Sequence, residues 1–339
     1  MKLWVSLFSV GVLTAWSPSA NALELCAVLD KKTGELKEGS PIKLRSVCKT
    51  KKNGTPIEIS IGTTEALAAA TANTAAREDL EQYLEVDTTN HVVRFTGANV
   101  QIRSGAGASW GTGVSATPDV NGLGNLIIGY DENDSNDKTG SHNLVLGPYH
   151  TYSQAGGLVA GYKNAATAGY ASVTGGSENT ASEQYSAVTG GQSNLAGAAH
   201  ATVSGGRQNQ SIGQHASVGG GNINVAQGVY AAVSGGHNNR ASGNYAVVSA
   251  GRNNTASENE TSVSGGSQNR ATARLAAVSG GQGNEASGIA SHISGGRFND
   301  ATATYSVVSG GAGNTASATE ATVSGGDANT ADVEGSHLP

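Results

Sequence analysis

The sequence predicts an all-β protein, a parallel β-solenoid (β-roll) built from 15-residue repeats. An apolar residue returns every 15 residues from Val173 to Val323, as do a glycine from Gly176 to Gly326 and an asparagine from Asn179 to Asn329. Large side chains for a thick core are scarce, because 49 of 339 residues are glycine and aromatics make up 5%. A strict period of this kind is typical of solenoids, in which each repeat packs on its neighbours.

Each repeat follows the consensus A-x-V-S-G-G-x-x-N-x-A-S-G-x-Y, which fits two short strands and two turns. Because strand side chains alternate, Ala171 and Val173 are predicted to face inward and Ser172 outward. Ala181 is the small apolar residue of the second strand. Glycine is expected to make one tight corner, and asparagine to take the left-handed conformation at the next and to pair amides along the stack. These predicted core and turn residues include Val173, Gly176, Asn179, Val188, Gly191, Asn194, Val203, Gly206, Asn209, Val233, Gly236 and Asn239.

Upstream of the strict repeats, three short apolar runs end in glycine: Leu126–Gly129, Leu144–Gly147 and Leu158–Gly161. Each is predicted to be one strand of a less regular rung. Leu158, Gly161 and Asn164 extend the 15-residue register by one unit. We therefore expect the repeat β-roll at 156–335, irregular rungs and a cap at 86–155, and a tail at 336–339.

The N-terminus predicts export. Residues 1–22 resemble a signal peptide, with Lys2, an apolar stretch and a small-residue cleavage site at Ala20-Asn21-Ala22. A membrane anchor and a lipid attachment at Cys26 are the alternatives. The expected location is therefore extracellular or the outer cell surface, and no later segment has the length of a membrane-spanning helix.

Two further N-terminal segments precede the repeats. Residues 23–62 hold both cysteines, Cys26 and Cys48, and an even pair in an exported chain predicts one structural disulfide, with free thiols as the alternative. Residues 63–85 are rich in alanine and predict a short helix that Thr64 caps and that ends near Leu84. From His91 onward apolar residues alternate with polar ones, as in a strand.

The interior of one coil has room for little more than a valine and two alanines, which predicts that several coils pack side by side. We expect a homotrimer. The net charge of −6 gives no basic footprint for nucleic acid, and no nucleic-acid partner is expected.

The strand and turn chemistry over residues 156–335 resembles the head repeats of YadA-like trimeric autotransporter adhesins. The resemblance implies a left-handed, trimeric parallel β-roll with a role in adhesion. The period of 15 residues, where 14 is commoner, and the Ser-Gly-Gly ending depart from that family's pattern. The chain ends at Pro339 without a stalk and membrane barrel, so we expect a secreted protein without a membrane anchor of its own.

Candidate chemical sites are few. Asp131, Asn133, Ser135 and Asp137 alternate as in a calcium loop, but Asn136 stands where the turn glycine belongs, and a solvated loop is the main interpretation. His200 and His215 share a column with tyrosines, which indicates stacked turn residues, with a ligand surface as the alternative. Nothing in the sequence predicts catalysis or a cofactor.

The sequence thus predicts a non-enzymatic, adhesin-like rod that binds an extracellular protein or glycan at many points. The expected binding residues lie in the variable turn before each asparagine: Arg207, His237, Arg252, Arg297 and Phe298. A purely architectural matrix or appendage component is the alternative. An ice-binding solenoid and a polysaccharide-acting β-helix are less favoured, because the outward threonines are interrupted and the acidic residues are scattered.

Overall fold

The computed structural model describes residues 24–26, 43–45, 80–105, 120–132 and 135–339. Contacts divide the chain into two units, Met1–Val100 and Gln101–Pro339. The predicted signal peptide, the proposed Cys26–Cys48 disulfide and most of the predicted helix fall outside the described residues or side chains.

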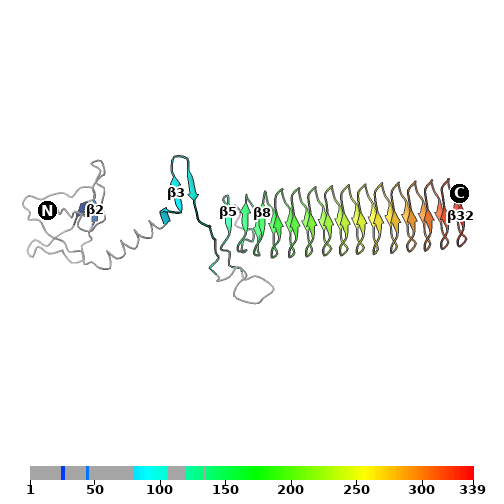
Figure 1. Cartoon of the computed structure of the whole chain (residues 1–339), viewed down its shortest axis with the longest axis horizontal. Coiled ribbons are helices and arrows are strands. Elements are labelled where there is room, and N and C mark those ends of the chain that lie inside the picture. Colours follow the sequence, from blue (N-terminus) through cyan, green and yellow to red (C-terminus); the bar gives the residue numbers. More distant parts are fainter. Residues whose placement is uncertain (1–23, 27–42, 46–79, 106–119, 133–134) are drawn as a thin grey trace, which may run out of the picture. The chain divides into compact units, whose positions relative to one another are not determined.

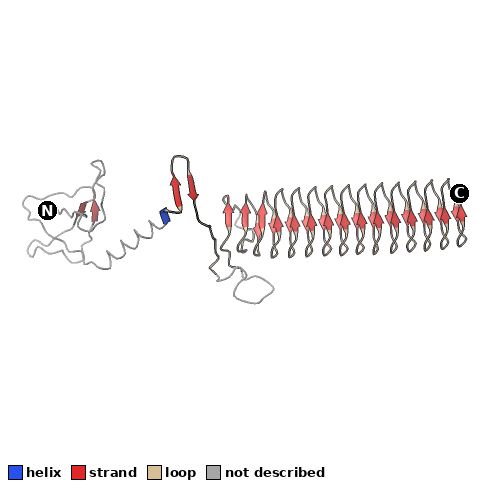
Figure 2. Ribbon diagram, in the orientation of Figure 1, coloured by secondary structure: helices blue, strands red, loops and turns tan. Residues whose placement is uncertain are grey.

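The second unit is a β-solenoid whose coils stack in register along one axis (Figure 1). Its strands form two parallel sheets of 15 and 13 strands, so the predicted fold class is confirmed (Figure 2). The first sheet runs through β5 (Leu126–Ile128), β6 (Leu144–Leu146), β8 (Leu158–Ala160), β10 (Ser172–Val173), β12 (Ala187–Val188), β14 (Thr202–Val203), β16 (Ser217–Val218), β18 (Ala232–Val233), β20 (Val247–Val248), β22 (Ser262–Val263), β24 (Ala277–Val278), β26 (His292–Ile293), β28 (Val307–Val308), β30 (Thr322–Val323) and β32 (His337–Leu338).

The second sheet forms another wall of the same coils, because its strands alternate along the chain with those of the first sheet. It runs through β7 (Thr151–Tyr152), β9 (Ala165–Ala166), β11 (Thr180–Ala181), β13 (Leu195–Ala196), β15 (Gln210–Ser211), β17 (Val225–Ala226), β19 (Arg240–Ala241), β21 (Thr255–Ala256), β23 (Arg270–Ala271), β25 (Glu285–Ala286), β27 (Asp300–Ala301), β29 (Thr315–Ala316) and β31 (Thr330–Ala331). In the regular part each strand pairs with the strand 15 residues later, as between Val173 and Val188.

A single coil closes its own interior. The valine column of the first sheet and the alanine column of the second are 0–2% exposed from Val173 to Ala331. Ala171 and Val173 point inward while Ser172 is partly exposed, as the alternation predicts. The coils of one chain, stacked on one another, therefore bury this thin interior without a second chain.

The asparagines play a different part from the one predicted. They lie inside the coil, at most 1% exposed from Asn164 to Asn314, and their φ angles are not positive. The left-handed conformation falls one residue earlier, at positions such as Glu178, Ser193 and Gln208. The amides also do not form a simple amide-to-amide stack, because each side chain bonds mainly to backbone groups. Inside the coil the asparagine amide is used to bond backbone groups of the turns. The left-handed backbone conformation is therefore taken by the residue before the asparagine.

The register of the leading rungs also differs from the prediction. Val159, not Leu158, pairs with Val173, and Leu158 pairs with Ser172 on the outer face. Gly161 and Asn164 keep the predicted positions, since their partners lie 15 residues on. Between the buried valine and the turn glycine there is one residue in this rung (Ala160) and two in the regular rungs, for example Thr174 and Gly175.

In the first unit, β1 (Glu24–Cys26) pairs antiparallel with β2 (Lys43–Arg45). The predicted helix ends sooner than expected: Leu80 and Glu81 are helical, but Leu84 begins β3 (Leu84–Asp87). This strand forms an antiparallel hairpin with β4 (Val92–Phe95). Leu84 pairs with Phe95 across the hairpin, a long-range contact that a local helix propensity does not anticipate.

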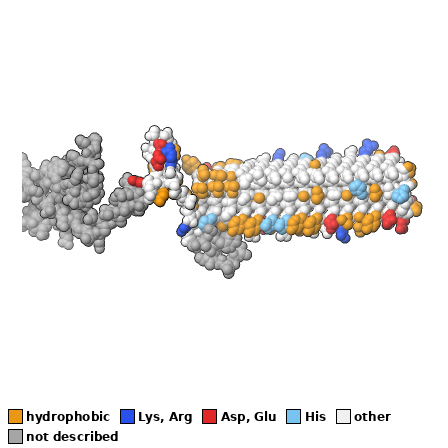
Figure 3. All heavy atoms as spheres, viewed as in Figure 1, with side chains coloured by type: hydrophobic (Ala, Val, Ile, Leu, Met, Phe, Trp, Pro, Cys, Tyr) orange, Lys and Arg blue, Asp and Glu red, His pale blue; other side chains and the backbone are white. Residues whose placement is uncertain are grey.

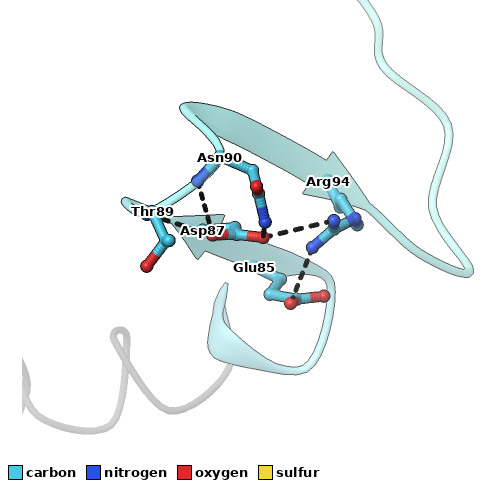
Figure 4. Close-up of polar contacts among 5 residues, drawn as sticks. All are labelled: Glu85, Asp87, Thr89, Asn90 and Arg94. Atoms are coloured by element: carbon cyan, nitrogen blue, oxygen red, sulfur yellow. Dashed lines mark hydrogen bonds and ion pairs between the residues drawn. The ribbon is translucent and has the colours of Figure 1, made fainter.

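Polar contacts hold the hairpin turn (Figure 4). Arg94 bridges Glu85 at 2.9 Å and Asp87 at 3.4 Å across the two strands. Asp87 accepts hydrogen bonds from the backbone N–H groups of Thr89 and Asn90 and from the Asn90 side chain. The hydrogen bonds from Asn90, and the weaker one from Arg94, lower the pKa of the Asp87 carboxyl.

Candidate binding surface

One corner of the solenoid carries a continuous line of variable side chains. Between the two sheets, single parallel bridges link one residue of each rung to the next from Tyr162 to Asp327. We call this column the corner ridge. Its members are Tyr162, Ser177, Gln192, Arg207, Asn222, His237, Arg252, Ser267, Gln282, Arg297, Ala312 and Asp327.

Four of the five predicted binding residues lie in the corner ridge. Arg207, His237, Arg252 and Arg297 are exposed members of it, and Lys and Arg side chains follow one edge of the rod in Figure 3. His237 and Arg252 occupy adjacent rungs, and Asn222 separates Arg207 from His237. Because parallel strands stack about 4.8 Å apart, these side chains emerge at fixed multiples of that spacing.

Phe298 lies one residue beyond the corner ridge, in the left-handed corner position (φ 55°). Its ring is 55% exposed, and the Arg297 guanidinium lies 5.8 Å from the ring centroid. The ring also lies against Gly283 of the preceding rung, where an added Cβ would stand 2.5 Å from it. Phe298 and Arg297 thus form an exposed cation–π pair at this corner.

The histidine column forms a stack of rings, as the sequence indicates. From Tyr170 through Tyr185, His200, His215 and Tyr230 to Tyr245, neighbouring ring centroids lie 4.7–5.3 Å apart with interplanar angles of at most 15°. Each ring between Tyr170 and Tyr245 has a ring neighbour on both faces, whereas Tyr245, at the end of the stack, has one on a single face. An added Cβ at Gly156 would stand 2.8 Å from the Tyr170 ring, so that end of the stack is also covered.

The candidate calcium residues do not form an open ligand set. Lys138 Nζ lies 3.2 Å from Asp131 Oδ1, and the buried Tyr152 hydroxyl donates to Asp131 Oδ2 at 2.7 Å. Asp137 accepts from the backbone and hydroxyl of Thr139. Asn133 is outside the described residues. A lysine ammonium already neutralises Asp131, so the arrangement favours the solvated-loop interpretation.

Burial and the negative charge of Asp131 act on Tyr152. Desolvation, followed by the hydrogen bond to Asp131 and its charge, raises the pKa of the Tyr152 phenol well above its usual range. The phenol therefore stays protonated and remains a donor. Together with Lys138, it fixes Asp131 in the irregular leading rungs.

His150 is an interior polar residue that the sequence analysis did not single out. It is fully buried, its Nδ1 accepts the Asn164 N–H at 3.1 Å, and its Nε2 lies 3.0 Å from the Leu146 carbonyl. In the next rung the Asn164 side chain makes the corresponding contacts with Asn179 N–H and the Ala160 carbonyl. His150 thus begins the asparagine column, and its 14-residue spacing from Asn164 is the signal that identifies it.

A pair of carboxylates lies on the outer face of the second sheet. Glu285 and Asp300 pair in adjacent rungs, and Arg270 of the preceding rung reaches Glu285 at 3.6 Å. Burial, and secondarily the charge of Glu285, raises the pKa of Asp300. Within the ranges that the structure describes, no three His, Cys, Asp or Glu side chains gather as a metal site would require.

No protein-family model matches the chain, and no curated protein matches it in sequence. Among the described residues, no helix combines the length and apolar character needed to cross a membrane.

Proposed function

We propose that this protein is a secreted or cell-surface, adhesin-like rod that binds an extracellular ligand along its corner ridge and catalyses no reaction. One observation carries the proposal: a buried scaffold of near-identical rungs holds an exposed, continuous line of side chains that change from rung to rung. A rigid, repeated surface of this kind supports multivalent contact, in which several weak contacts add to one strong attachment.

We further propose that the rod works as a homotrimer. Support comes from the outer face of the leading rungs, which carries Leu126, Ile128, Leu144, Leu146 and Leu158. In the later rungs the first of these two columns is mixed, as at Ser172 and Ala187, and the second is mostly serine or threonine, as at Thr174. Leu126 and Ile128 are 46% and 58% exposed. Figure 3 shows hydrophobic side chains gathered over these rungs. A second and third copy are the occupants we propose, in line with the resemblance to trimeric adhesin heads.

Export through the N-terminal signal peptide would place the rod outside the cell. This part of the proposal rests on the sequence of residues 1–22 alone. Fractionation of the native host, with detection of the mature N-terminus, tests it. Retention of full-length chain inside the cell would contradict it.

The binding proposal is tested with purified protein on cells and on immobilised matrix glycoproteins. A variant with Arg207, His237, Arg252 and Arg297 replaced by Gln is expected to lose binding while keeping its fold. The matched control replaces four exposed serines on the outer face of the first sheet, Ser234, Ser249, Ser264 and Ser279, with Thr. Equal binding by both variants would show that the ligand attaches away from the corner ridge, and no binding by the wild-type protein would favour a purely architectural role.

The trimer is tested by sedimentation equilibrium. The wild-type chain is expected at three times its 33.8 kDa mass, less the signal peptide. Leu144→Ser with Leu146→Ser is expected to shift it toward monomer. A folded wild-type monomer at micromolar concentration would exclude the trimer. It would not contradict the proposal that the corner ridge binds a ligand.

A further inference from the structure

Charge is distributed unevenly along the rod. The chain as a whole carries a net charge of −6, yet no aspartate or glutamate occurs from Gln184 through Ser257. The same stretch contains Arg207, Arg240 and Arg252, together with three histidines. The middle rungs are therefore a positive segment within an acidic protein, and the screening length of about 8 Å at physiological salt keeps the distant acids from cancelling it.

These arginines differ from those nearer the C-terminus in their partners. Arg270 and Arg274 pair with Glu285 at 3.6 Å and Glu260 at 3.8 Å. In contrast, no ion pair among the described residues involves Arg207 or Arg252, although both side chains are exposed. Their guanidinium donors are thus available to an anion from outside.

Arg240 adds a third cation beside the corner ridge. It follows His237 by three residues and begins β19 on the outer face of the second sheet. Its side chain bonds to Ser242 at 2.8 Å and to Gln227, both neutral. No carboxylate therefore neutralises Arg240 within the described residues.

The scaffold spaces the cations in a line. Arg207 and Arg252 are three rungs apart, which is about 14 Å at the usual strand spacing, and His237 lies between them. Neutral amides fill the remaining places, with Asn222 in the corner ridge and Asn238 donating to Asn253 at 2.9 Å beside it. A line that combines two arginines with uncharged hydrogen-bonding side chains between them is complementary to a chain that carries both anionic groups and hydroxyls.

The aromatic residues decide between classes of polyanion. Single-stranded nucleic acid is usually held by stacking of bases on open aromatic faces. Here the rings from Tyr170 to Tyr245 cover one another at 4.7–5.3 Å. Amide side chains beside the cations instead match sugar hydroxyls.

We propose that the corner ridge from Gln192 to Arg252 is a binding site for an extended acidic polysaccharide. Its carboxylate or sulfate groups pair with Arg207 and Arg252, and its hydroxyls bond to Asn222, His237 and Asn238. The inference rests on the proposed function, since it names the chemical class of ligand for the same surface. It adds that only the acid-free part of the ridge binds with high affinity, so Arg297, whose rung also carries Asp300, contributes little.

The test measures binding of the purified full chain to immobilised heparin and polygalacturonate, with neutral dextran as the reference. The wild-type protein is expected to bind both anionic polysaccharides and not dextran, and to release as sodium chloride rises. Arg207→Gln with Arg252→Gln is expected to weaken binding about ten-fold or more, because two charge-assisted contacts are lost.

The matched control is Arg270→Gln with Arg274→Gln, which removes the same charge from arginines that already have carboxylate partners. Binding by this control is expected to stay within about two-fold of wild type. If both double variants bound the anionic polysaccharides equally weakly, binding would depend on net charge alone. That result would overturn the proposed binding site. Circular dichroism and thermal melting confirm that both variants fold.

Other outcomes separate this inference from the proposed function. Failure to bind either anionic polysaccharide, with ridge-dependent binding to cells retained, overturns the ligand class and leaves the adhesin-like role standing. Tighter binding to single-stranded DNA or to anionic phospholipid vesicles than to polysaccharides of similar charge density also overturns it. If the wild-type protein binds the anionic polysaccharides but not cells, the result contradicts the proposed adhesin-like function and supports the proposed class of ligand.

Discussion

The side-chain oxygen of Asn209 accepts the backbone N–H of Asn224, in the next rung, at 2.9 Å. Asn224 repeats the contact with Asn239, also at 2.9 Å, and its Nδ2 donates to the carbonyls of Gly220 and Gly236 at 2.8 and 3.0 Å. The column thus joins neighbouring rungs where the strand ladders are interrupted. It satisfies backbone groups that the turns leave inside the coil.

Replacing Asn224 by Ala is expected to destabilise the rod. The Gly220 carbonyl loses this donor and the Asn239 N–H loses its acceptor, at a cost of about 1–3 kcal/mol for each group left unpaired, while the Gly236 carbonyl keeps the Asn222 N–H. Urea unfolding with circular dichroism measures the change. Gln192→Ala in the exposed corner ridge is the control and is expected within about 0.5 kcal/mol of wild type. Equal midpoints for both variants would contradict a stabilising role for the column.

The two glycines of each repeat are not equivalent. Gly221 has φ of 86°, and an added Cβ would stand 2.2 Å from the Gly236 carbonyl oxygen. At Gly220 a Cβ meets nothing within 4 Å. We expect Gly221→Ala to cost at least about 2 kcal/mol, because left-handed strain adds to the clash, and Gly220→Ala to be close to neutral. The alanine at position 250, where other repeats have the first glycine, is a natural instance of the tolerated change.

The same pair of variants is compared by thermal melting. Both variants replace glycine by alanine, so the effect of alanine on the unfolded chain is the same in both. The difference between their melting temperatures therefore reports the folded structure alone. Similar melting temperatures would contradict the steric argument.

Tyr152 is expected to stabilise the leading rungs through Asp131. Tyr152→Phe keeps the buried ring but removes the 2.7 Å hydrogen bond to Asp131 Oδ2. A hydrogen bond to a charged group contributes about 1.5–3 kcal/mol. Hydrogen exchange should therefore rise in the leading rungs and change little in the regular ones. The control Tyr245→Phe removes an exposed hydroxyl, and an equal rise there would argue against the contact.

Asp300 predicts a pH dependence of stability. Its pKa is raised by burial and by Glu285, so the folded chain binds the proton more tightly than the unfolded chain. The resulting stability is fully present below the ordinary aspartate pKa of 3.8 and is lost as pH rises through the raised value. Asp300→Asn stays neutral throughout and is therefore expected to raise the melting temperature at neutral pH.

The gain from Asp300→Asn should disappear in acid, at about pH 3, where the wild-type carboxyl is also protonated. Melting curves at both pH values measure it. Asp327→Asn, at an exposed place in the corner ridge, is the control. A gain of the same size at both pH values would contradict the linkage.

The sequence predicted the parallel solenoid, the inward valines and alanines, and the placing of Arg207, His237, Arg252 and Arg297 in one turn column. It could do so because a strict period leaves one possible register, in which identical residues stack on identical residues. It did not find His150 or the hairpin of β3 with β4. Both depend on partners outside the strict repeat, where the rung length changes or the strands pair antiparallel.

By itself, the sequence determined the repeating coil, because fifteen residues with fixed apolar, glycine and asparagine positions specify where the chain turns and what faces inward. Only the tertiary structure decided what each fixed residue does. Asn224 lies inside the coil while Ile223 before it takes the left-handed corner, because the backbone groups buried at the turn need hydrogen-bond partners. Only stacking in register, likewise, turns residues that are 15 apart in sequence into neighbours on one continuous ridge.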